Sequence, residues 1–366
     1  MDKLFGGIYK GKRVLITGHT GFKGSWLALW LTSLGANVTG YALQPPTKPN
    51  HFDLLDLHLT STIANILDRE ALRSALEQCQ PDIVFHLAAQ PIVRESYAFP
   101  VETFDTNIMG TVHVLDACRS YGKVQAIVNI TSDKCYQNIE RLEGYTESDP
   151  MGGDDPYSAS KGAAEIVSQA FRHSFFNPKD YGHKHHTLMA NVRAGNVIGG
   201  GDWAKDRLIP DIMRATNAGE PVTIRNPQAV RPWQHVLEPL SGYLHLGWKL
   251  LEGEAAFADN WNFGPLDSAS LTVGEVTTFA QKYWDEIKFT VQPSVSQVHE
   301  ATLLVLDSSK ARKQLQWQSL WDNEKTFART VEWYKDFYQR KQLNSNRDLA
   351  EYVNDARKAG VLWANT

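Results

Sequence analysis

A hydroxyl, an acid and a base stand side by side where a buried strand is expected to end. The apolar run 126–130 leads almost directly into Ser132, Asp133 and Lys134. Opposite charges at the mouth of a buried strand are costly unless they take part in binding or chemistry. A carboxyl group and an amine at this position could move protons to and from a bound molecule. We therefore predict that these three residues are catalytic, with a structural ion pair between Asp133 and Lys134 as the alternative.

Tyr157 and Lys161 form a second reactive pair. They are four residues apart in segment 157–175, which is predicted to be helical, so they lie on one face. An ammonium beneath a phenol stabilises the phenolate and is expected to lower the pKa of Tyr157 toward neutrality. Tyr157 would then be a base for a hydroxyl group. An ordinary surface pair on a helix is the alternative.

A glycine-rich turn near the start of the chain could hold phosphates. It follows the predicted strand 13–17 and opens the predicted helix 22–34. Glycines allow a tight turn, and the helix N-terminus offers free N–H groups to a pyrophosphate. We therefore predict dinucleotide binding, with a purely structural turn as the alternative. The cofactor-binding residues expected from this turn are Gly18, Thr20, Gly21, Phe22, Lys23 and Gly24.

The second predicted strand, 37–42, leaves the choice between NAD and NADP open. It ends with neither an acid for a ribose diol nor an arginine for a 2′-phosphate, and the nearest cation is Lys48. Asp68 could accept a hydrogen bond from an adenine amine. Capping a helix that begins at Arg69 is an equally good interpretation of Asp68.

The scaffold that positions these residues is an alternation of strands and helices. The predicted strands are 13–17, 37–42, a short one near Ile63, 82–87, 126–130 and 187–192. The predicted helices between them are 22–34, 69–78, 101–121 and 157–175. Apolar strands that alternate with helices predict an α/β fold with a Rossmann-type doubly wound parallel sheet.

The regular alternation ends after Gly195. A loop at 199–203 and short mixed elements follow, and they predict a smaller mixed α/β C-terminal substrate domain. Two amphipathic helices, about 324–342 and 347–358, are expected to close this small domain.

Composition excludes several classes of protein. The 366-residue chain carries a net charge of −4, so no basic field favours nucleic acid. No stretch of about 18 apolar residues predicts a membrane span, and the start of the chain has no signal-peptide core. The scattered Cys79, Cys118 and Cys135 are typical of reduced thiols in the cytoplasm. The His-rich segment 183–186 lacks flanking Cys or carboxylate ligands, so we predict no metal site.

The sequence resembles the extended short-chain dehydrogenase/reductase family over most of its length. The glycine-rich turn and the Tyr157–Lys161 pair carry part of the family pattern. Further motifs are His86-Leu87-Ala88-Ala89, Asn107 within TNIMGT, Arg193-Ala194-Gly195-Asn196-Val197, Arg231-Pro232-Trp233 and Trp261-Asn262-Phe263-Gly264. The later motifs resemble those of nucleotide-sugar enzymes. The resemblance therefore implies NAD as cofactor and a nucleotide sugar as substrate.

The resemblance also implies a division of the chain and roles for particular residues. Residues 1–193, with a returning segment about 232–264, would form the NAD-binding Rossmann domain, and residues 194–231 and 265–366 the nucleotide-sugar-binding domain. Additional implied cofactor residues are Asp68, Leu87, Ala88 and Ala89, together with Tyr157 and Lys161. The implied substrate residues are Gln90, Arg94, Arg193, Asn196, Arg207, Arg231 and Asn262.

Two of these implied contacts concern the diphosphate. Asn196 and Arg231 would contact it, and a guanidinium suits the role because it pairs bidentately with phosphate oxygens. A structural ion pair is the alternative for Arg231. A loop with satisfied polar groups is the alternative for Gln90 and Arg94.

The triplet Ser132-Asp133-Lys134 resembles the Thr-Asp-Glu triplet of the nucleotide-sugar 4,6-dehydratases, with lysine in place of glutamate. With Gly199–Trp203, Arg231–His235 and His299-Glu300-Ala301, this lysine variant is most similar to the dehydratases that act on CDP-glucose. The resemblance implies that Tyr157 takes the C4 hydroxyl proton and Ser132 hydrogen-bonds the developing oxyanion. Asp133 would then protonate the departing C6 hydroxyl.

The role of Lys134 has two interpretations. As the base for the C5 proton, the lysine would have to be neutral, which requires burial or a neighbouring cation. A charged lysine would instead stabilise the enolate. We favour the base role. The residues themselves do not identify the nucleotide base of the substrate.

Family resemblance extends to assembly and biological role. The apolar faces of segments 101–121 and 157–175 resemble those that pair across a dimer, which implies a homodimer or homotetramer; burial within one chain is the alternative. The product would serve deoxysugar synthesis for a bacterial surface polysaccharide such as the lipopolysaccharide O-antigen. A 4-epimerase, a simple dehydrogenase and a non-catalytic NAD-sensing regulator remain alternative functions.

Overall fold

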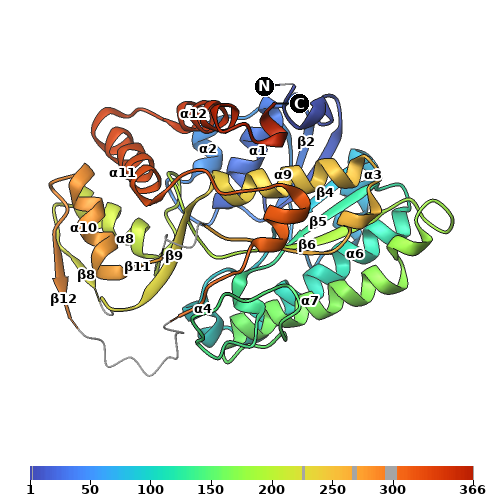
Figure 1. Cartoon of the computed structure of the whole chain (residues 1–366), viewed down its shortest axis with the longest axis horizontal. Coiled ribbons are helices and arrows are strands. Elements are labelled where there is room, and N and C mark those ends of the chain that lie inside the picture. The colour runs from blue at the N-terminus through green and yellow to red at the C-terminus, as the bar shows by residue number, and fades with distance from the viewer. Residues whose placement is uncertain (2, 225–226, 266–269, 293–302, 366) are drawn as a thin grey trace.

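A seven-stranded parallel sheet forms the centre of the protein in a computed structural model that describes residues 1, 3–224, 227–265, 270–292 and 303–365 (Figure 1). The strand order is β10-β6-β5-β4-β1-β2-β3. The strands are β1 (Arg13–Thr17), β2 (Asn37–Ala42), β3 (Thr60–Ile63), β4 (Ile83–His86), β5 (Ala126–Ile130), β6 (Leu188–Ala194) and β10 (Asn260–Phe263). The predicted Rossmann-type parallel sheet is confirmed, since every neighbouring pair is parallel. The motif His299-Glu300-Ala301 lies outside the described residues.

Helices cover both faces of this sheet, as Figure 1 shows with α9 on one side and α6 and α7 on the other. The covering helices are α1 (Phe22–Ser33), α3 (Arg69–Cys79), α6 (Gly110–Tyr121), α7 (Pro156–Ser174) and α9 (Leu237–Leu251). Val14 and Ile16 of β1 pack in the core under α1 and α9, whereas Leu15 packs in the opposite core under α3 and α6. Alternation of side chains along a strand produces these two cores.

The helix predicted over 101–121 is not one regular α-helix. It consists of α5 (Pro100–Phe104), a π-helical turn (Asp105–Met109) and α6. The short helices α2 (His51–Leu55) and α4 (Val93–Ala98) lie in segments for which the sequence predicted no helix. Both are too short for a periodic apolar pattern to identify them.

A smaller mixed α/β region lies beside the sheet, on the left in Figure 1. Its strands are β7 (Asn196–Ile198), β8 (Val222–Ile224), β9 (Val230–His235), β11 (Ser270–Thr272) and β12 (Phe289–Val291). They form a three-stranded sheet, β11-β9-β7, and a two-stranded sheet, β12-β8. The helices α8 (Leu208–Asn217), α10 (Val273–Tyr283) and α11 (Asn323–Arg340) contribute to its core. Among the described residues no helix is long and apolar enough to cross a membrane.

The last helix, α12 (Ser345–Lys358), packs on the large domain. Leu349, Tyr352 and Val353 lie in the core under α1 and α9, and the Trp363 ring stacks on Phe5 with 5.0 Å between ring centroids. The prediction that α12 closes the small domain is therefore wrong. An amphipathic pattern reveals an apolar face but does not identify which core receives it.

Candidate active site

The glycine-rich turn joins β1 to α1 and leaves no room for side chains. A Cβ atom at Gly18, whose φ is +79°, would lie 2.7 Å from the backbone nitrogen of Ala88. A Cβ atom at Gly24 would lie 2.1 Å from the Gly18 carbonyl oxygen. Gly21 is the N-cap of α1, and the N–H groups of the first helical turn have no partners within the helix. A tight turn that leads into a helix N-terminus fits a pyrophosphate.

Thr20 and Asp68, two predicted cofactor residues, form structural hydrogen bonds within the chain. Thr20 Oγ1 donates a hydrogen bond of 2.9 Å to the Leu43 carbonyl oxygen. Asp68 caps α3, since its carboxylate accepts a hydrogen bond of 3.0 Å from the Ala71 N–H. Leu87, Ala88 and Ala89 follow β4 and remain partly exposed beside the turn. Contacts of these residues with a cofactor stay predictions.

The acid–base triplet lies in a short turn after β5. Ser132 Oγ donates a 2.9 Å hydrogen bond to Asp133 Oδ1 and accepts one of 3.2 Å from the Lys134 N–H. Asp133 is only 6% exposed. Burial raises the pKa of Asp133, although Lys134 and the hydrogen bond from Ser132 act in the opposite direction. The Lys134 side chain is partly exposed.

Tyr157 and Lys161 are buried on the first turns of α7. Asp155 caps this helix and accepts a hydrogen bond of 2.9 Å from the Ser158 N–H. Burial raises the pKa of Tyr157 to about 12, and a hydrogen bond with Ser132 opposes that rise. Burial also lowers the pKa of Lys161 to about 8. The expected lowering of the Tyr157 pKa is therefore not found, because burial outweighs the neighbouring groups.

Cations gather around this acid and phenol. Burial, Arg207 and Lys161 together lower the pKa of Lys23 to about 8. The charges of Lys23 and Arg231 act to lower the pKa of Asp133, and the charge of Arg207 acts to lower the pKa of Tyr157. Since the repulsion among these cations would be relieved by an anion, the cluster suits a phosphate-bearing molecule.

The predicted substrate residues differ in the ion pairs and hydrogen bonds that they already form within the chain. Arg207 pairs with Asp202 at 2.8 Å, and Arg94 lies 3.7 Å from a carboxylate oxygen of Asp206. Arg231 donates a hydrogen bond of 2.9 Å to the Val230 carbonyl oxygen. The side chains of all three arginines are partly exposed, and so is that of Asn196 at the start of β7.

Gln90 is held by its own loop. Its amide nitrogen donates hydrogen bonds to the Ile92 carbonyl oxygen at 3.1 Å and to Thr103 Oγ1 at 3.0 Å, and its amide oxygen accepts one from the Ile92 N–H. This geometry matches the alternative interpretation, a loop with satisfied polar groups. A substrate contact by Gln90 stays a prediction.

Arg193 and Asn262 are not placed for substrate contact, so these two predictions are corrected. Arg193 is 1% exposed and pairs bidentately with Glu165, with N–O distances of 2.9 Å for both bonds. The Asn262 amide donates to the Tyr145 carbonyl oxygen at 2.8 Å and accepts from Tyr136 at 2.8 Å. Both residues lie on strands buried on both faces, where their side chains point into the fold.

Among the described residues no group of three His, Cys, Asp or Glu side chains could hold a metal ion.

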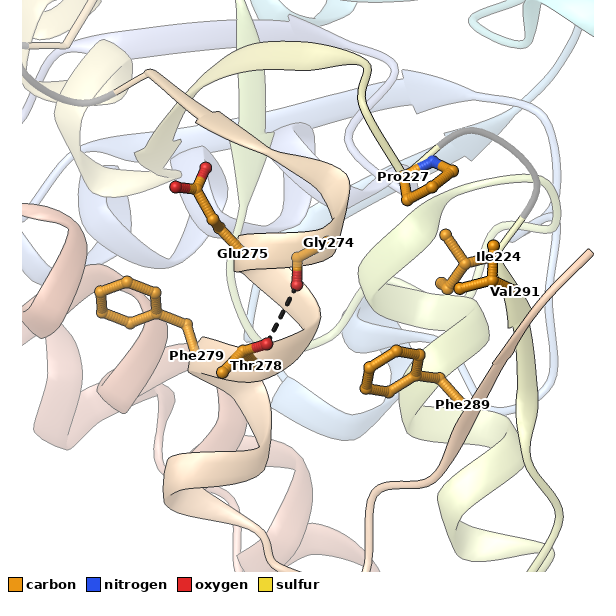
Figure 2. Close-up of a pocket in the computed structure, with 8 residues that line it drawn as sticks. All are labelled: Ile224, Pro227, Gly274, Glu275, Thr278, Phe279, Phe289 and Val291. Carbon is orange, nitrogen blue, oxygen red and sulfur yellow. Dashed lines mark hydrogen bonds between the residues drawn. The ribbon is translucent and has the colours of Figure 1, made fainter. Parts of the chain in front are cut away.

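An apolar pocket of about 460 Å³ lies apart from this site, in the small region beside α10, with the Phe279 and Phe289 rings on its wall (Figure 2). It contains none of the predicted catalytic residues. Its lining consists of Ile224, Pro227, Gly274, Glu275, Thr278, Phe279, Phe289 and Val291.

Comparison with known proteins identifies the family. The GDP-mannose 4,6 dehydratase family matches residues 15–330. The CDP-glucose 4,6-dehydratase of Salmonella typhimurium is 50% identical over 358 residues, which are 97% of this chain and 99% of that protein. This chain therefore belongs to the GDP-mannose 4,6 dehydratase family, and the predicted resemblance to nucleotide-sugar enzymes of the extended short-chain dehydrogenase/reductase type is confirmed.

Solved structures agree on the fold. An epimerase from Methanothermobacter thermautotrophicus superimposes with a TM-score of 0.79 at 23% identity, covering 92% of this chain and 96% of that one. A dTDP-glucose 4,6-dehydratase from Bacillus anthracis in complex with NAD gives 0.71 at 20% identity, covering 88% and 96%. The shared fold includes both dehydratases and epimerases, so the fold alone does not select the reaction.

Proposed function

We propose that this protein is an NAD-dependent CDP-glucose 4,6-dehydratase, which forms CDP-4-keto-6-deoxyglucose and water. The observation that carries this proposal is the buried Asp133, with its raised pKa, held by Ser132 at the side of Tyr157. A buried carboxyl group whose pKa is raised is suited to protonating a departing hydroxyl group. A relative of that activity, 50% identical over nearly the whole chain, supports the same substrate.

Cofactor and substrate would meet at the carboxyl ends of β1, β4 and β5. Bound NAD would supply hydride acceptance at C4 of the sugar and hydride return at C6. The glycine-rich turn would hold its pyrophosphate, with Asp68 on the adenine. Arg207, Arg231 and Asn196 would bind the substrate diphosphate, and Arg94 and Gln90 would contact the sugar.

The residues of the chain divide the proton transfers among them. Tyr157 takes the proton of the C4 hydroxyl, and Ser132 donates a hydrogen bond to the oxygen that becomes a ketone. The buried Lys161 stabilises the phenolate that Tyr157 becomes. The new ketone acidifies C5, and loss of the C5 proton allows the C6 hydroxyl to leave with a proton from Asp133. A hydride returned to C6 and a proton returned to C5 would then complete the product, so no net oxidation results.

Lys134 acts on C5 in this scheme. Its place beside Asp133 fits the removal of the C5 proton, which requires the neutral amine. A charged Lys134 would instead stabilise the enolate that forms when the proton leaves. In either case Lys134 acts at the elimination step.

We propose a homodimer or homotetramer that pairs through segments 101–121 and 157–175, because exposed apolar side chains lie in and next to these segments. These side chains are Tyr97, Phe99, Val101, Phe104, Met109, Ile166 and Phe175. The three cysteines are free thiols, which suits the cytoplasm. The product would enter deoxysugar synthesis for a bacterial surface polysaccharide such as the O-antigen.

A turnover assay of the purified protein with CDP-glucose and NAD⁺ tests this function. We expect a 4-keto-6-deoxy product, detected by its alkaline absorbance and by a mass lower by one water, without accumulation of NADH. An isomerised sugar of unchanged mass would establish a 4-epimerase instead. No turnover with CDP-, UDP-, dTDP- or GDP-glucose would favour a non-catalytic NAD-sensing regulator.

A further inference from the structure

A buried hydrogen-bond network centred on His51 connects the phosphate-binding helix to the last two helices. His51 Nδ1 lies 2.8 Å from Ser25 Oγ on α1, and His51 Nε2 lies 2.8 Å from Ser345 Oγ on α12. Ser25 Oγ donates to the Phe22 carbonyl oxygen at 2.9 Å, and Trp333 Nε1 on α11 donates to Ser345 Oγ at 3.0 Å. His51, Ser25, Ser345 and Trp333 are at most 1% exposed. We call Phe22, Ser25, His51, Trp333 and Ser345 the His51 network.

The Trp333 donor at one end and the Phe22 carbonyl acceptor at the other fix the direction of every bond in this network. Because the Ser25 hydroxyl proton goes to Phe22, Ser25 Oγ must accept from His51 Nδ1–H. Burial lowers the pKa of His51 to about 3, so its ring is neutral and Nε2 is an acceptor. Ser345 then donates to Nε2 while it accepts from Trp333. All the hydrogen bonds point one way, and each depends on the neutral Nδ1–H form of His51.

The same residues enclose the glycine loop, residues 199–202. A Cβ atom at Gly200 would lie 2.0 Å from the Trp333 ring, and one at Gly201 would lie 2.5 Å from the His51 ring. Trp26 Nε1 donates a 2.9 Å hydrogen bond to the Gly200 carbonyl oxygen. The backbone of this loop therefore rests directly on the His51 network, with no space between them.

The glycine loop ends in a residue that holds a site arginine. The Asp202 N–H donates to the Tyr334 hydroxyl at 2.9 Å, and the Asp202 carboxylate pairs with Arg207 at 2.8 Å. The positive charge of Arg207 in turn acts to lower the pKa of Tyr157 and that of Lys23. A shift of His51 would therefore displace the first turn of α1 at one end and the support of Arg207 at the other.

We propose that His51 is a positioning residue, which sets the phosphate-binding turn of α1 and the Arg207 loop relative to each other and so couples cofactor binding to substrate binding. The coupling rests on the proposed NAD and nucleotide-sugar sites. His51 itself touches neither ligand in this scheme and acts through Ser25 and the glycine loop. Sequence reasoning did not find it, because its partners are dispersed over the chain from α1 to α12.

Removal of the distant end of the network tests the proposal. Ser345→Ala deletes the hydrogen bond to His51 Nε2 far from the phosphate turn in the chain. We expect NADH to bind about three- to tenfold more weakly, the equivalent of one hydrogen bond, and the KM for CDP-glucose to rise while kcat changes less. NADH affinity is measured by fluorescence titration of the full-length protein, which needs no sugar turnover. It therefore remains interpretable if the proposed dehydratase activity fails.

Ser241→Ala is the matched control. Ser241 is equally buried and also accepts from a tryptophan, Trp317, at 2.8 Å, but it lies on α9 outside the His51 network. It should lose thermal stability as Ser345→Ala does and retain the NADH affinity of the unaltered protein. Equal NADH affinities in the two variants would overturn the proposal.

Three further measurements separate coupling from simple support. Ser25→Ala/Ser345→Ala should bind NADH no more weakly than the weaker single variant, because both substitutions break one network; additive losses would contradict this. Ser345→Thr, which keeps the hydroxyl, should restore affinity. If Ser345→Ala does not fold, nitrogen NMR of ¹⁵N-histidine-labelled unaltered protein decides: the Nδ1–H form of His51 supports the network, and the Nε2–H form refutes it.

Discussion

In the proposed mechanism, Asp133 is the residue at which a dehydratase differs from an enzyme that only exchanges a hydroxyl for a ketone. Asp133→Asn should lower kcat about 100- to 10,000-fold, because the amide still accepts from Ser132 but has no proton for the departing C6 hydroxyl. The measurement is the initial rate of 4-keto-6-deoxy product at saturating CDP-glucose. Since burial raises the pKa of Asp133, activity should fall as pH rises through that raised pKa.

Asp116 provides a control for this substitution. It lies on α6, pairs with Arg119 at 2.7 Å and is partly exposed, so Asp116→Asn should keep the rate of the unaltered protein. If Asp133→Asn retained more than about a tenth of kcat, Asp133 would not be the acid, and an epimerase or dehydrogenase would be favoured.

At the residue scale, the sequence predicted the positions of those candidate site residues that lie at the end of a strand or the start of a helix. Asp133 follows a buried strand, and Tyr157 with Lys161 opens a helix, so local pattern alone placed them correctly on their elements. Arg193 and Asn262 were misassigned because β6 and the end of β10 are buried on both faces. On such strands, alternation cannot tell a side chain that faces a ligand from one that faces the core.

At the element scale, the Arg193–Glu165 pair joins β6 to α7, the helix that carries Tyr157 and Lys161. Thr131 donates to Glu165 at 2.5 Å, and Asn191 donates to it at 3.0 Å. Arg193 and Glu165 are both buried, so each charge depends on the other. Glu165 follows Lys161 by one turn, and the Arg193–Glu165 pair therefore fixes the face of α7 on which Lys161 lies.

Arg193→Met should lower the free energy of unfolding by about 3–5 kcal/mol, because it leaves the Glu165 carboxylate buried without its partner. Urea unfolding followed by tryptophan fluorescence measures the loss. The double variant Arg193→Met/Glu165→Met should recover part of it. The folded Arg193→Met protein should keep its KM for CDP-glucose, whereas Arg231→Met should raise it; the opposite pattern would restore Arg193 as a substrate residue.

Local pattern predicted the long elements well and their departures from regularity poorly. Strands 13–17 and 37–42 were placed at their observed bounds because apolar and β-branched residues predominate in each, between turn residues. The π-helical turn at 105–109 was missed, since it inserts no residue type that breaks a helix. It places Asn107 so that its amide donates to Ser160 on α7 at 2.8 Å, a tertiary contact outside the reach of local pattern.

At the scale of the whole molecule, one buried carboxyl group joins three distant segments. Glu238, near the start of α9, accepts hydrogen bonds from the Trp321 N–H at 2.7 Å and from the Tyr352 hydroxyl on α12 at 2.8 Å. It also accepts one from the Leu320 N–H at 3.0 Å. These contacts fasten the C-terminal segment to the large domain. No sequence pattern predicts them, because the partners are more than 80 residues away.

The buried Glu238 carboxyl group should make the free energy of unfolding depend on pH. Burial raises the pKa of Glu238 from 4.5 to about 7, so the native state favours the protonated form. The contribution of Glu238 to the free energy of unfolding is therefore complete below about pH 4.5 and is lost as pH rises through 7. Relative to Glu238→Gln, which does not titrate, the free energy of unfolding of the unaltered protein should fall by about 2 kcal/mol between pH 5 and pH 8. Urea unfolding of both proteins at the two pH values measures the difference, and parallel pH profiles would show that Glu238 keeps its ordinary pKa in the folded protein.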